Sequence, residues 1–378
     1  MSPSLCWPLA RRNGLFAPVH GRYDRVQGAG MARIFGIDLR TLALFRILLG
    51  LAILADIGNL APWAADFFSD KGVLPRAAAL EALSGYRFSL YLANGKTAFV
   101  LLLMAVQVLA ALALILGWRT RAMTALNWLL LASLVNRNPI ILQGGDQLIT
   151  LLAFWGMFLP LGARFSIDAA LDANAAPAPG DGHLSVATAA MLGQVLYVYF
   201  FGALLKESPI WIPEGLAVYY ATQLDSFATP IGHWLRDQLG LTRALTYFVW
   251  SIELAAPFLL LSPVWHLPLR LLALAALVAM HLGFALCLHI GLFWAISIAS
   301  LSLFVPGAGW DWLGRRVYPP AKRRIALFYD EGCVFCEKTC RLLRTFCLTR
   351  DNPIRPAQGD AVAGPLLAAH KSWVVLDA

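Results

Sequence analysis

A series of long apolar segments constrains the fold of this chain more than any other feature. From about residue 40 such segments recur, each close to the roughly 20 residues with which a helix crosses a bilayer. Apolar runs without strict alternation indicate helices, because only helices and closed barrels satisfy the backbone within lipid. We therefore predict an all-α polytopic membrane protein with about eight spans, at residues 41–60, 98–117, 122–141, 147–163, 185–205, 244–263, 269–288 and 290–306.

The composition excludes a soluble protein. Apolar residues make up 59% of the chain and charged residues 14%, whereas soluble proteins have about 45–50% and about 25%. Disordered, collagen-like and coiled-coil classes are excluded by the same values. The net charge of +8 reflects topology, since no basic stripe with interleaved aromatics points to nucleic acid. The expected partners are membrane lipids, and the expected location is the cell (inner or plasma) membrane.

The basic residues predict the orientation. With eight spans, Arg33, Arg40, Arg119, Arg121, Arg315, Arg316, Lys322, Arg323 and Arg324 fall on one side of the membrane. Cytoplasmic loops carry an excess of Lys and Arg, so we expect this side and the N-terminus to be cytoplasmic. An error of one helix moves the C-terminal segment, and its thiols, to the other side.

The chain divides into three parts by composition. Residues 1–36 read as a disordered basic leader and residues 37–318 as the transmembrane domain, which holds a short Ala-Pro-rich linker at 174–181. Residues 319–378 have the composition of a soluble domain, with a strand at 325–329, a helix through Cys333 to Cys347 and a second strand at 373–376. These elements are fewer than an independent α/β domain contains, so we expect a partial domain.

Few ionisable residues lie within the spans, and each is a functional candidate. Arg46 and Asp56 are about 15 Å apart along one helix, so each is expected to find a partner elsewhere in the bundle. Glu253 fits either a structural ion pair or a cavity wall. His281 and His289 lack a third ligand with metal spacing, so we expect no metal site. The alternative for all of them is an interhelical salt bridge or a side chain that reaches the interface.

Lys206 ends the apolar run from Tyr197 and precedes Trp211. A lysine at the mouth of an apolar cavity is partly desolvated, which favours its neutral form and lets it act as a base. The alternative is a lysine that simply extends to the membrane surface.

Ordered motifs over residues 37–306 resemble the horizontally transferred transmembrane (HTTM) domain family, which is related to vitamin K-dependent γ-carboxylases. They are the stretch Leu42 to Gly50, the aromatic loop after it, Gly202 to Lys206 with Trp211, Glu214 and Gly215, and the segment from His281 to Phe304. The resemblance implies that Lys206 deprotonates a reduced, vitamin K-like quinone, and that oxygenation yields a base that removes a glutamate γ-proton before CO2 is captured.

The chain departs from the carboxylase pattern at one place. Where the carboxylases have an Asn-Asn-His-type stretch, this chain has Gln143-Gly-Gly-Asp-Gln147, so the histidine position falls on Gly145. Asp146 or Gln143 can supply a different polar contact. This difference puts protein glutamate carboxylation in doubt and leaves quinol or lipid chemistry of another kind.

A Cys-x-x-Cys motif is the strongest local signal in the chain. Cys333 follows a strand and opens a helix, where the positive helix end favours a thiolate, and Cys336 can resolve a mixed disulfide. Asp330, Cys333 and Cys336 resemble the signature of the DCC family of thiol-disulfide oxidoreductases, which are thioredoxin-like. The match covers residues 324–378, the first half of such a domain. The alternatives are a structural zinc site and inert thiols; Cys340 and Cys347 read as packing residues.

Two functional hypotheses follow. The first is an enzyme with quinol-linked or carboxylase-like chemistry at Lys206, coupled to dithiol exchange with a redox partner protein at Cys333 and Cys336. The second is a lipid- or quinone-binding or transport module without chemistry, in which the tail is a docking segment. The sequence leaves the substrate and the oligomeric state open.

Overall fold

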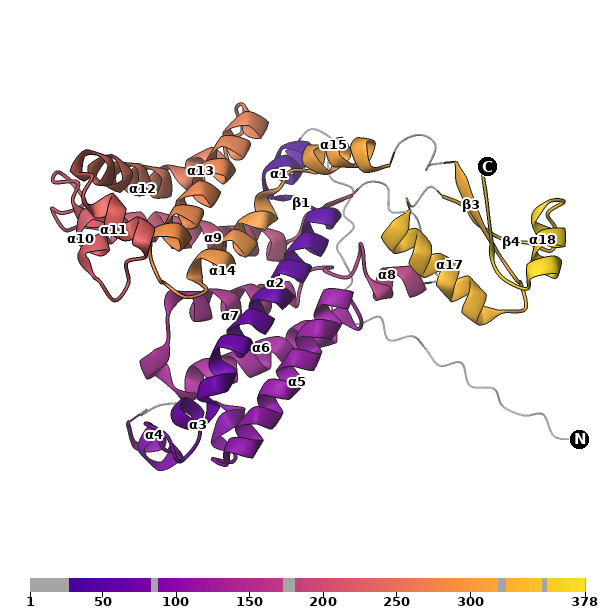
Figure 1. The fold of residues 1–378 in the computed structure, drawn as a ribbon. Helices are drawn as coiled ribbons and strands as arrows, with labels where there is room; N and C mark the ends of the chain where they lie inside the picture. Colours follow the sequence, from indigo (N-terminus) through magenta and orange to yellow (C-terminus); the bar gives the residue numbers. More distant parts are fainter. Residues whose placement is uncertain (1–26, 83–87, 173–180, 319–323, 349–351, 378) are drawn as a thin grey trace, which may run out of the picture.

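The computed structural model describes residues 27–82, 88–172, 181–318, 324–348 and 352–377. It consists of a large helical bundle and a small α/β tail (Figure 1). The first 26 residues of the predicted leader, most of the linker and residues 319–323 lie outside the described residues. The expectation of a disordered leader does not hold for α1 (Gln27–Phe35), a helix that packs against α9 (Val186–Leu204).

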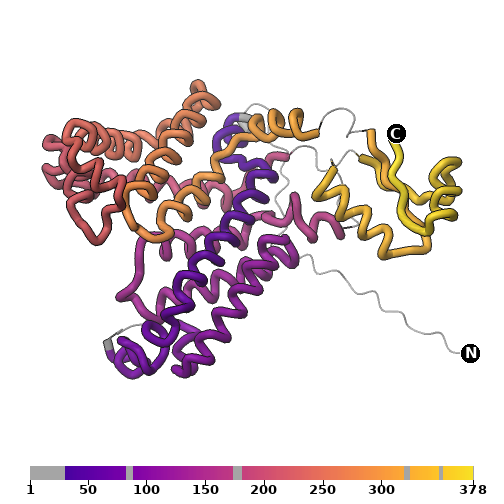
Figure 2. The backbone as a smooth tube through the Cα atoms, viewed as in Figure 1, coloured from indigo at the N-terminus to yellow at the C-terminus, as the bar shows by residue number. Residues whose placement is uncertain are grey.

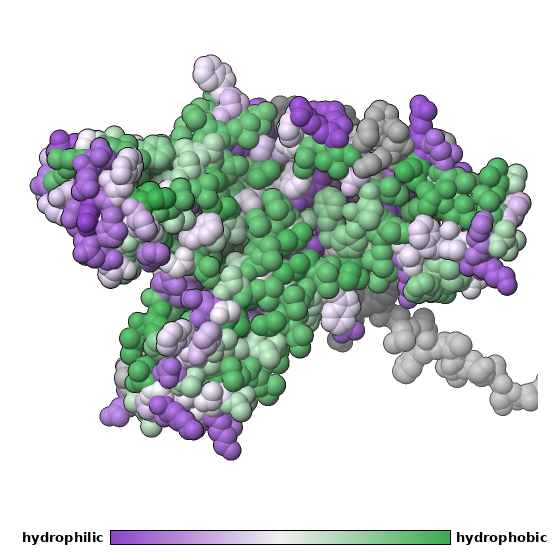
Figure 3. Space-filling model, viewed as in Figure 1, coloured by the Kyte–Doolittle hydropathy of each residue, from purple (hydrophilic) through white to green (hydrophobic). Residues whose placement is uncertain are grey.

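Among the described residues, five helices are long and apolar enough to cross a membrane: Leu39–Phe68, Thr97–Leu116, Val186–Leu204, Leu239–Leu260 and His266–Cys287. A sixth span results if Phe293–Phe304 and Gly307–Val317, which are bent by 91° against each other, count as one. The prediction of a helical, multi-pass membrane protein is thus confirmed, whereas the count of eight spans is not. The apolar surface over the bundle ends in hydrophilic patches at its extremities (Figure 3).

The remaining predicted spans form shorter or more polar helices. The segment 122–141 lies in α6 (Thr120–Arg137), which carries basic and amide side chains, and α7 (Gly144–Gly156) has only 13 residues. The last predicted span, 290–306, contains α14 (Phe293–Leu301) and η4 (Ser302–Phe304), and α15 (Gly307–Val317) follows it after the bend. Sequence hydropathy alone does not report where a helix ends. The helical segments here end at residues 137, 156 and 304, before the predicted span ends at 141, 163 and 306.

The bundle contains two groups of helices. In the first, α2 (Leu39–Leu60) packs on α5 (Thr97–Leu116), which packs on α6, which packs on α7. In the second, α12 (Leu239–Leu260) lies between α9 and α13 (His266–Cys287). Helix α14 contacts α2, α7 and α13 and so joins the groups (Figure 2). One hydrophobic core runs through both groups.

Short elements connect the long helices. They are β1 (Ile37–Asp38) paired with β2 (Gly182–His183), η1 (Ala61–Trp63), α3 (Ala64–Phe68), α4 (Arg76–Ala82), η2 (Leu90–Leu92), η3 (Pro139–Ile141), α8 (Ile167–Leu171), α10 (Ala217–Gln223) and α11 (Pro230–Arg236). Helices α10 and α11 pack on α12 at one extremity of the bundle.

The tail has a three-stranded sheet in the order β4-β3-β5, formed by β3 (Ile325–Tyr329), β4 (Ile354–Pro356) and β5 (Val374–Asp377). Strand β3 is parallel to β4 and antiparallel to β5. Helix α17 (Val334–Cys347) connects β3 to β4, and α18 (Ala363–His370) precedes β5. The predicted strand, helix and second strand are confirmed. Strand β4 was not predicted because it has only three residues and contains a proline. Helix α17 packs on α8 of the bundle.

Candidate functional site

Lys206 forms an ion pair with Glu253 in the second helix group. Lys206 lies two residues beyond α9, and its ammonium bonds to Oε2 of Glu253 on α12. The two side chains are 19% and 10% exposed, so the pair is largely withdrawn from solvent. Of the two roles expected for Glu253, an ion pair or a cavity wall, the structure shows the ion pair. The Lys206 side chain is directed into the bundle and does not simply extend to the membrane surface.

Trp211 covers the ammonium group of this pair. Its ring centroid lies 4.8 Å from Nζ of Lys206, within the range of a cation–π interaction. The loop that carries Trp211 is fixed to α12, because Tyr247 donates a hydrogen bond to the carbonyl of Pro213 at 2.6 Å. Lys206 is therefore held between a carboxylate and an indole.

A hydrogen-bonded tyrosine and histidine lie close to the ion pair. Tyr199 Oη and Nε2 of His281 on α13 are 2.9 Å apart, and both side chains are buried. Nδ1 of His281 has no hydrogen-bond partner among the described residues. A Cβ at Gly202, one turn after Tyr199 on α9, would lie 3.8 Å from Oε2 of Glu253, so the two polar pairs lie near the C-terminal end of α9.

The arrangement places one carboxylate, one ammonium, one phenol and one imidazole between three helices. Such a set can bind a polar ring substituent, orient it and exchange a proton with it. Lys206, Glu253 and His281 were identified from the sequence. Tyr199 was not, although its spacing of seven residues from Lys206 places both on one helical face and was the available signal.

Arg46 has a structural position away from this cluster. Its fully buried guanidinium donates hydrogen bonds to four backbone carbonyls, those of Ile115, Leu161, Arg164 and Phe165. Gly117, with φ of +71°, makes room for it, since a Cβ there would lie 2.6 Å from Nη1 of Arg46. The partner expected for Arg46 is thus a set of carbonyls and not an acid.

Gly145 and Asp146 lie at the start of α7. A Cβ at Gly145 already meets Cδ1 of Ile296 at 3.0 Å and Cα of Phe293 at 3.4 Å, so a larger side chain there requires Ile296 and α14 to shift. Asp146 accepts a hydrogen bond from the backbone N–H of Gln143 at 3.0 Å. Phe293 also contacts His281, with ring centroids 5.8 Å apart, and so links this region to the cluster.

The cysteine motif lies in the tail, separate from the cluster in the bundle. Cys333 caps the N-terminus of α17, and its Sγ accepts a hydrogen bond from the backbone N–H of Cys336 at 3.2 Å. The side-chain hydrogen bond with Cys333 raises the pKa of the Cys336 thiol. Asp330 accepts a hydrogen bond from the side-chain amide of Gln358 at 2.5 Å, which fixes the turn before Cys333.

The two further cysteines of α17 differ from each other. Cys340 is fully buried, and burial raises its pKa to about 11, in agreement with a packing residue. Cys347 is exposed, so its assignment as a packing residue is wrong, because it falls on the solvent side near the helix end. Within the described part of the chain, no group of three or more His, Cys, Asp or Glu side chains is arranged to hold a metal ion.

Comparison with known proteins identifies the family of the helical bundle. The model of the HTTM domain matches residues 36–312, which is well over half of the 378 residues. The match includes Lys206, Glu253 and His281 and stops before the cysteine motif. No curated protein and no solved structure matches the chain. This multi-pass membrane protein therefore belongs to the HTTM domain family.

Proposed function

We propose that the bundle is a membrane enzyme that binds a quinol at the Lys206–Glu253 pair and removes a proton from it. The observation that carries this proposal is the ion pair itself, withdrawn from solvent and covered by Trp211. Ion pairs in such surroundings lose much of their attraction to the cost of desolvation, and apolar side chains of similar volume often replace them without loss of stability. A charged pair beside an apolar bundle is therefore a functional candidate.

The proposed step is a single proton transfer. The quinol O–H bond breaks and the proton passes to the carboxylate of Glu253, while the ammonium of Lys206 stabilises the quinolate oxygen that forms. The sequence assigned the base to Lys206 alone. Because the carboxylate and the ammonium are in contact, we assign it to the pair. Tyr199, seven residues before Lys206, and its partner His281 can hold a second polar substituent of the ring.

The resemblance to vitamin K-dependent γ-carboxylases supports a reduced quinone as substrate, with O2 and CO2 as co-reactants. The packing of Gly145 against Phe293 argues against a histidine in the carboxylase position, so we propose an acceptor other than a protein glutamate.

Quinol epoxidation by the purified protein in detergent tests the proposal. We expect epoxide from the parent, its loss in Lys206→Met and Glu253→Gln, and no change in Lys96→Met, which alters an exposed lysine before α5. A folded parent that binds quinol and forms no epoxide contradicts the enzyme and supports the alternative, a lipid- or quinone-binding or transport module.

We propose thiol–disulfide exchange as a second activity, located in the tail. It is supported by the hydrogen bond from the Cys336 N–H to Cys333 Sγ and by the order of strands, in which the motif follows a central strand flanked by one parallel and one antiparallel neighbour. That order and the resemblance to the DCC family favour a thioredoxin-like domain. A dithiol can also reduce an oxidised quinone, so we propose a redox partner protein or the bundle's own product as the oxidant.

Reduction of insulin disulfides by the full chain tests this activity. We expect turnover that Cys333→Ser abolishes and that Cys347→Ser, at the exposed cysteine of the same helix, leaves unchanged. Equal rates for both variants refute the assignment.

We also propose that α6 and α7 cross the membrane, which gives eight crossings and a cytoplasmic N-terminus. At one end Asp168 accepts hydrogen bonds from the N–H groups of Arg119 and Thr120, and at the other Arg137 donates to the carbonyl of Leu74. Helix α6 thus extends from α8 to the segment that precedes α4. Labelling of single cysteines at 121 and 140 from each side of the membrane tests the topology: labelling of both positions from one side contradicts it.

A further inference from the structure

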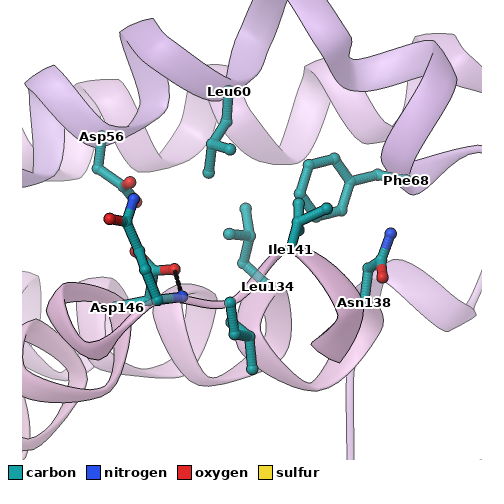
Figure 4. Close-up of a pocket in the computed structure, with 9 residues that line it drawn as sticks. Asp56, Leu60, Phe68, Leu134, Asn138, Ile141 and Asp146 are labelled. Carbon is teal, nitrogen blue, oxygen red and sulfur yellow. Dashed lines mark hydrogen bonds between the residues drawn. The ribbon is translucent and has the colours of Figure 1, made fainter. Parts of the chain in front are cut away.

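The pocket in the first helix group is too small for a further organic ligand. It is lined by apolar side chains and by Asp56, Asn138, Gln143 and Asp146. It has space for about one water molecule (Figure 4). Asp56 is 3% exposed and forms no hydrogen bond or ion pair with the residues that the structure describes, so the expectation of a partner for it in the bundle is not met. The surface of the bundle offers a larger unassigned area.

Helix α15 lies at the end of the bundle where α2 begins (Figure 1). It is bent by 91° against the helical segment formed by α14 and η4. Two contacts fix it to the first turn of α2: Arg40 pairs with Asp311 at 2.8 Å, and Trp310 donates a hydrogen bond to Oγ1 of Thr41 at 2.8 Å. Because α2 begins a membrane span, this position and this direction are those of a helix that runs along the membrane surface.

The outward face of α15 is amphipathic. Trp312, Leu313 and Val317 are exposed apolar side chains. Arg315 and Arg316 are also exposed, and Cζ of Arg316 lies 4.7 Å from the ring centroid of Trp312. Residues four apart share one face of a helix, so Trp312 with Arg316 and Leu313 with Val317 form two rows. Apolar side chains beside arginines are typical of helices that lie in a membrane interface.

A second exposed pair of an arginine and a tryptophan lies near the start of α2. The turn between α5 and α6 carries Trp118, Arg119 and Arg121, which are all exposed. Cζ of Arg119 lies 5.2 Å from the ring centroid of Trp118. The turn is close to α2, because a Cβ at Gly117 would lie 2.6 Å from Nη1 of Arg46. We call the exposed residues of α15 and of this turn the basic surface.

The aspartates beside the basic surface are bonded to other groups. Asp38, Asp181 and Asp311 pair with Arg40. Asp168 accepts hydrogen bonds from the start of α6. Within the described ranges, the four arginines of the basic surface form no ion pair with an acidic side chain. The basic surface therefore carries positive charge that the chain itself does not neutralise.

We propose that the basic surface binds anionic phospholipid. The arginines contact the head-group phosphates, because a guanidinium presents several N–H donors to phosphate oxygens. Trp312, Leu313 and Val317 contact the lipid chains, which a free phosphate does not have. No residue of the Lys206 site or of the cysteine motif belongs to this surface, so lipid binding here is independent of both proposed activities.

Native mass spectrometry of the purified full chain in detergent tests the proposal. Phosphatidylglycerol and phosphatidylcholine of one chain length are added in equal amounts, and the populations of lipid-bound protein give the Kd of each. The test variant carries Arg315→Gln and Arg316→Gln, which remove two exposed charges. The matched control carries Arg355→Gln and Lys371→Gln, which remove two exposed charges from the tail.

We expect the parent to prefer phosphatidylglycerol to phosphatidylcholine. Two basic residues near a membrane surface change an affinity for anionic lipid roughly 10- to 30-fold, so the test variant should bind phosphatidylglycerol more weakly by that factor. The control should bind as the parent does, and the Kd for phosphatidylcholine should not change in either variant. Arg315→Lys with Arg316→Lys keeps both charges and should retain most of the preference.

Four results overturn the proposal. Equal affinities of the parent for the two lipids show no selection for charge, and unchanged phosphatidylglycerol binding in the test variant places the lipid elsewhere. Equal losses in the test and control variants show a general effect of net charge. Displacement of the lipid by excess glycerol 3-phosphate shows a surface for free anions. Lys206→Met removes the proposed quinol chemistry and should leave lipid binding intact, so failure of either proposal is recognised separately.

Discussion

Replacement of Arg46 by methionine tests the structural assignment of a fully buried cation in the bundle. The side chain is fully buried in the core of the first helix group. Methionine has a similar length and fills much of the same volume, but it donates no hydrogen bond. Four backbone carbonyls, at residues 115, 161, 164 and 165, then lose their guanidinium donor.

The expected loss of stability follows from these contacts. A hydrogen bond from a charged donor contributes about 1.5–3 kcal/mol, and a buried carbonyl left without a donor costs about 1–3 kcal/mol. Three of the four bonds are 3.2–3.3 Å long and only that to Phe165 is short, at 2.5 Å. Since neighbouring contributions do not add, we expect about 3–5 kcal/mol of destabilisation of the folded state.

Tryptophan fluorescence during heating in detergent measures this loss. At about 2–4 °C per kcal/mol, the Tm of Arg46→Met should fall by roughly 6–20 °C. Arg46→Lys should recover only part of it, because one ammonium cannot reach all four carbonyls. Arg121→Met, at an exposed position of α6, is the control. A Tm of Arg46→Met equal to that of the control refutes the reasoning.

Three further predictions concern other parts of the chain. Gly145→His should lower stability by about 1–3 kcal/mol, because its side chain must enter space held by Phe293, and its Tm in detergent measures this. Tyr199→Phe leaves the buried imidazole of His281 without its hydroxyl partner and should cost about 1–3 kcal/mol, which a Tm equal to the parent's would contradict. Burial raises the pKa of the Cys340 thiol from 9.0 to about 11. The stability that this thiol contributes is therefore complete below pH 9 and is lost as the pH rises from 9 toward 11. Mass spectrometry after iodoacetamide treatment at about pH 10 should find Cys340 unmodified in the folded chain and modified after unfolding.

Local sequence determined much of the architecture. Apolar length alone predicted five of the long helices, because a lipid environment leaves a chain of this composition no other way to satisfy its backbone. The tail strand at 325–329 and the helix after Cys333 were predicted for the same local reason, since hydrophobic periodicity and a helix-opening cysteine motif act over a few residues.

Tertiary structure decided where the polar side chains of the bundle lie and what they contact. The sequence singled out Lys206 and Glu253 separately, but only the packing of α9 on α12 made them a pair. The sequence also predicted partners for Arg46 and Asp56. The fold gave Arg46 four carbonyls, whereas Asp56 is buried without a hydrogen bond or ion pair to the residues that the structure describes. Hydropathy and spacing describe a residue's own segment, whereas a partner from a helix 47 or more residues away depends on which helices pack together.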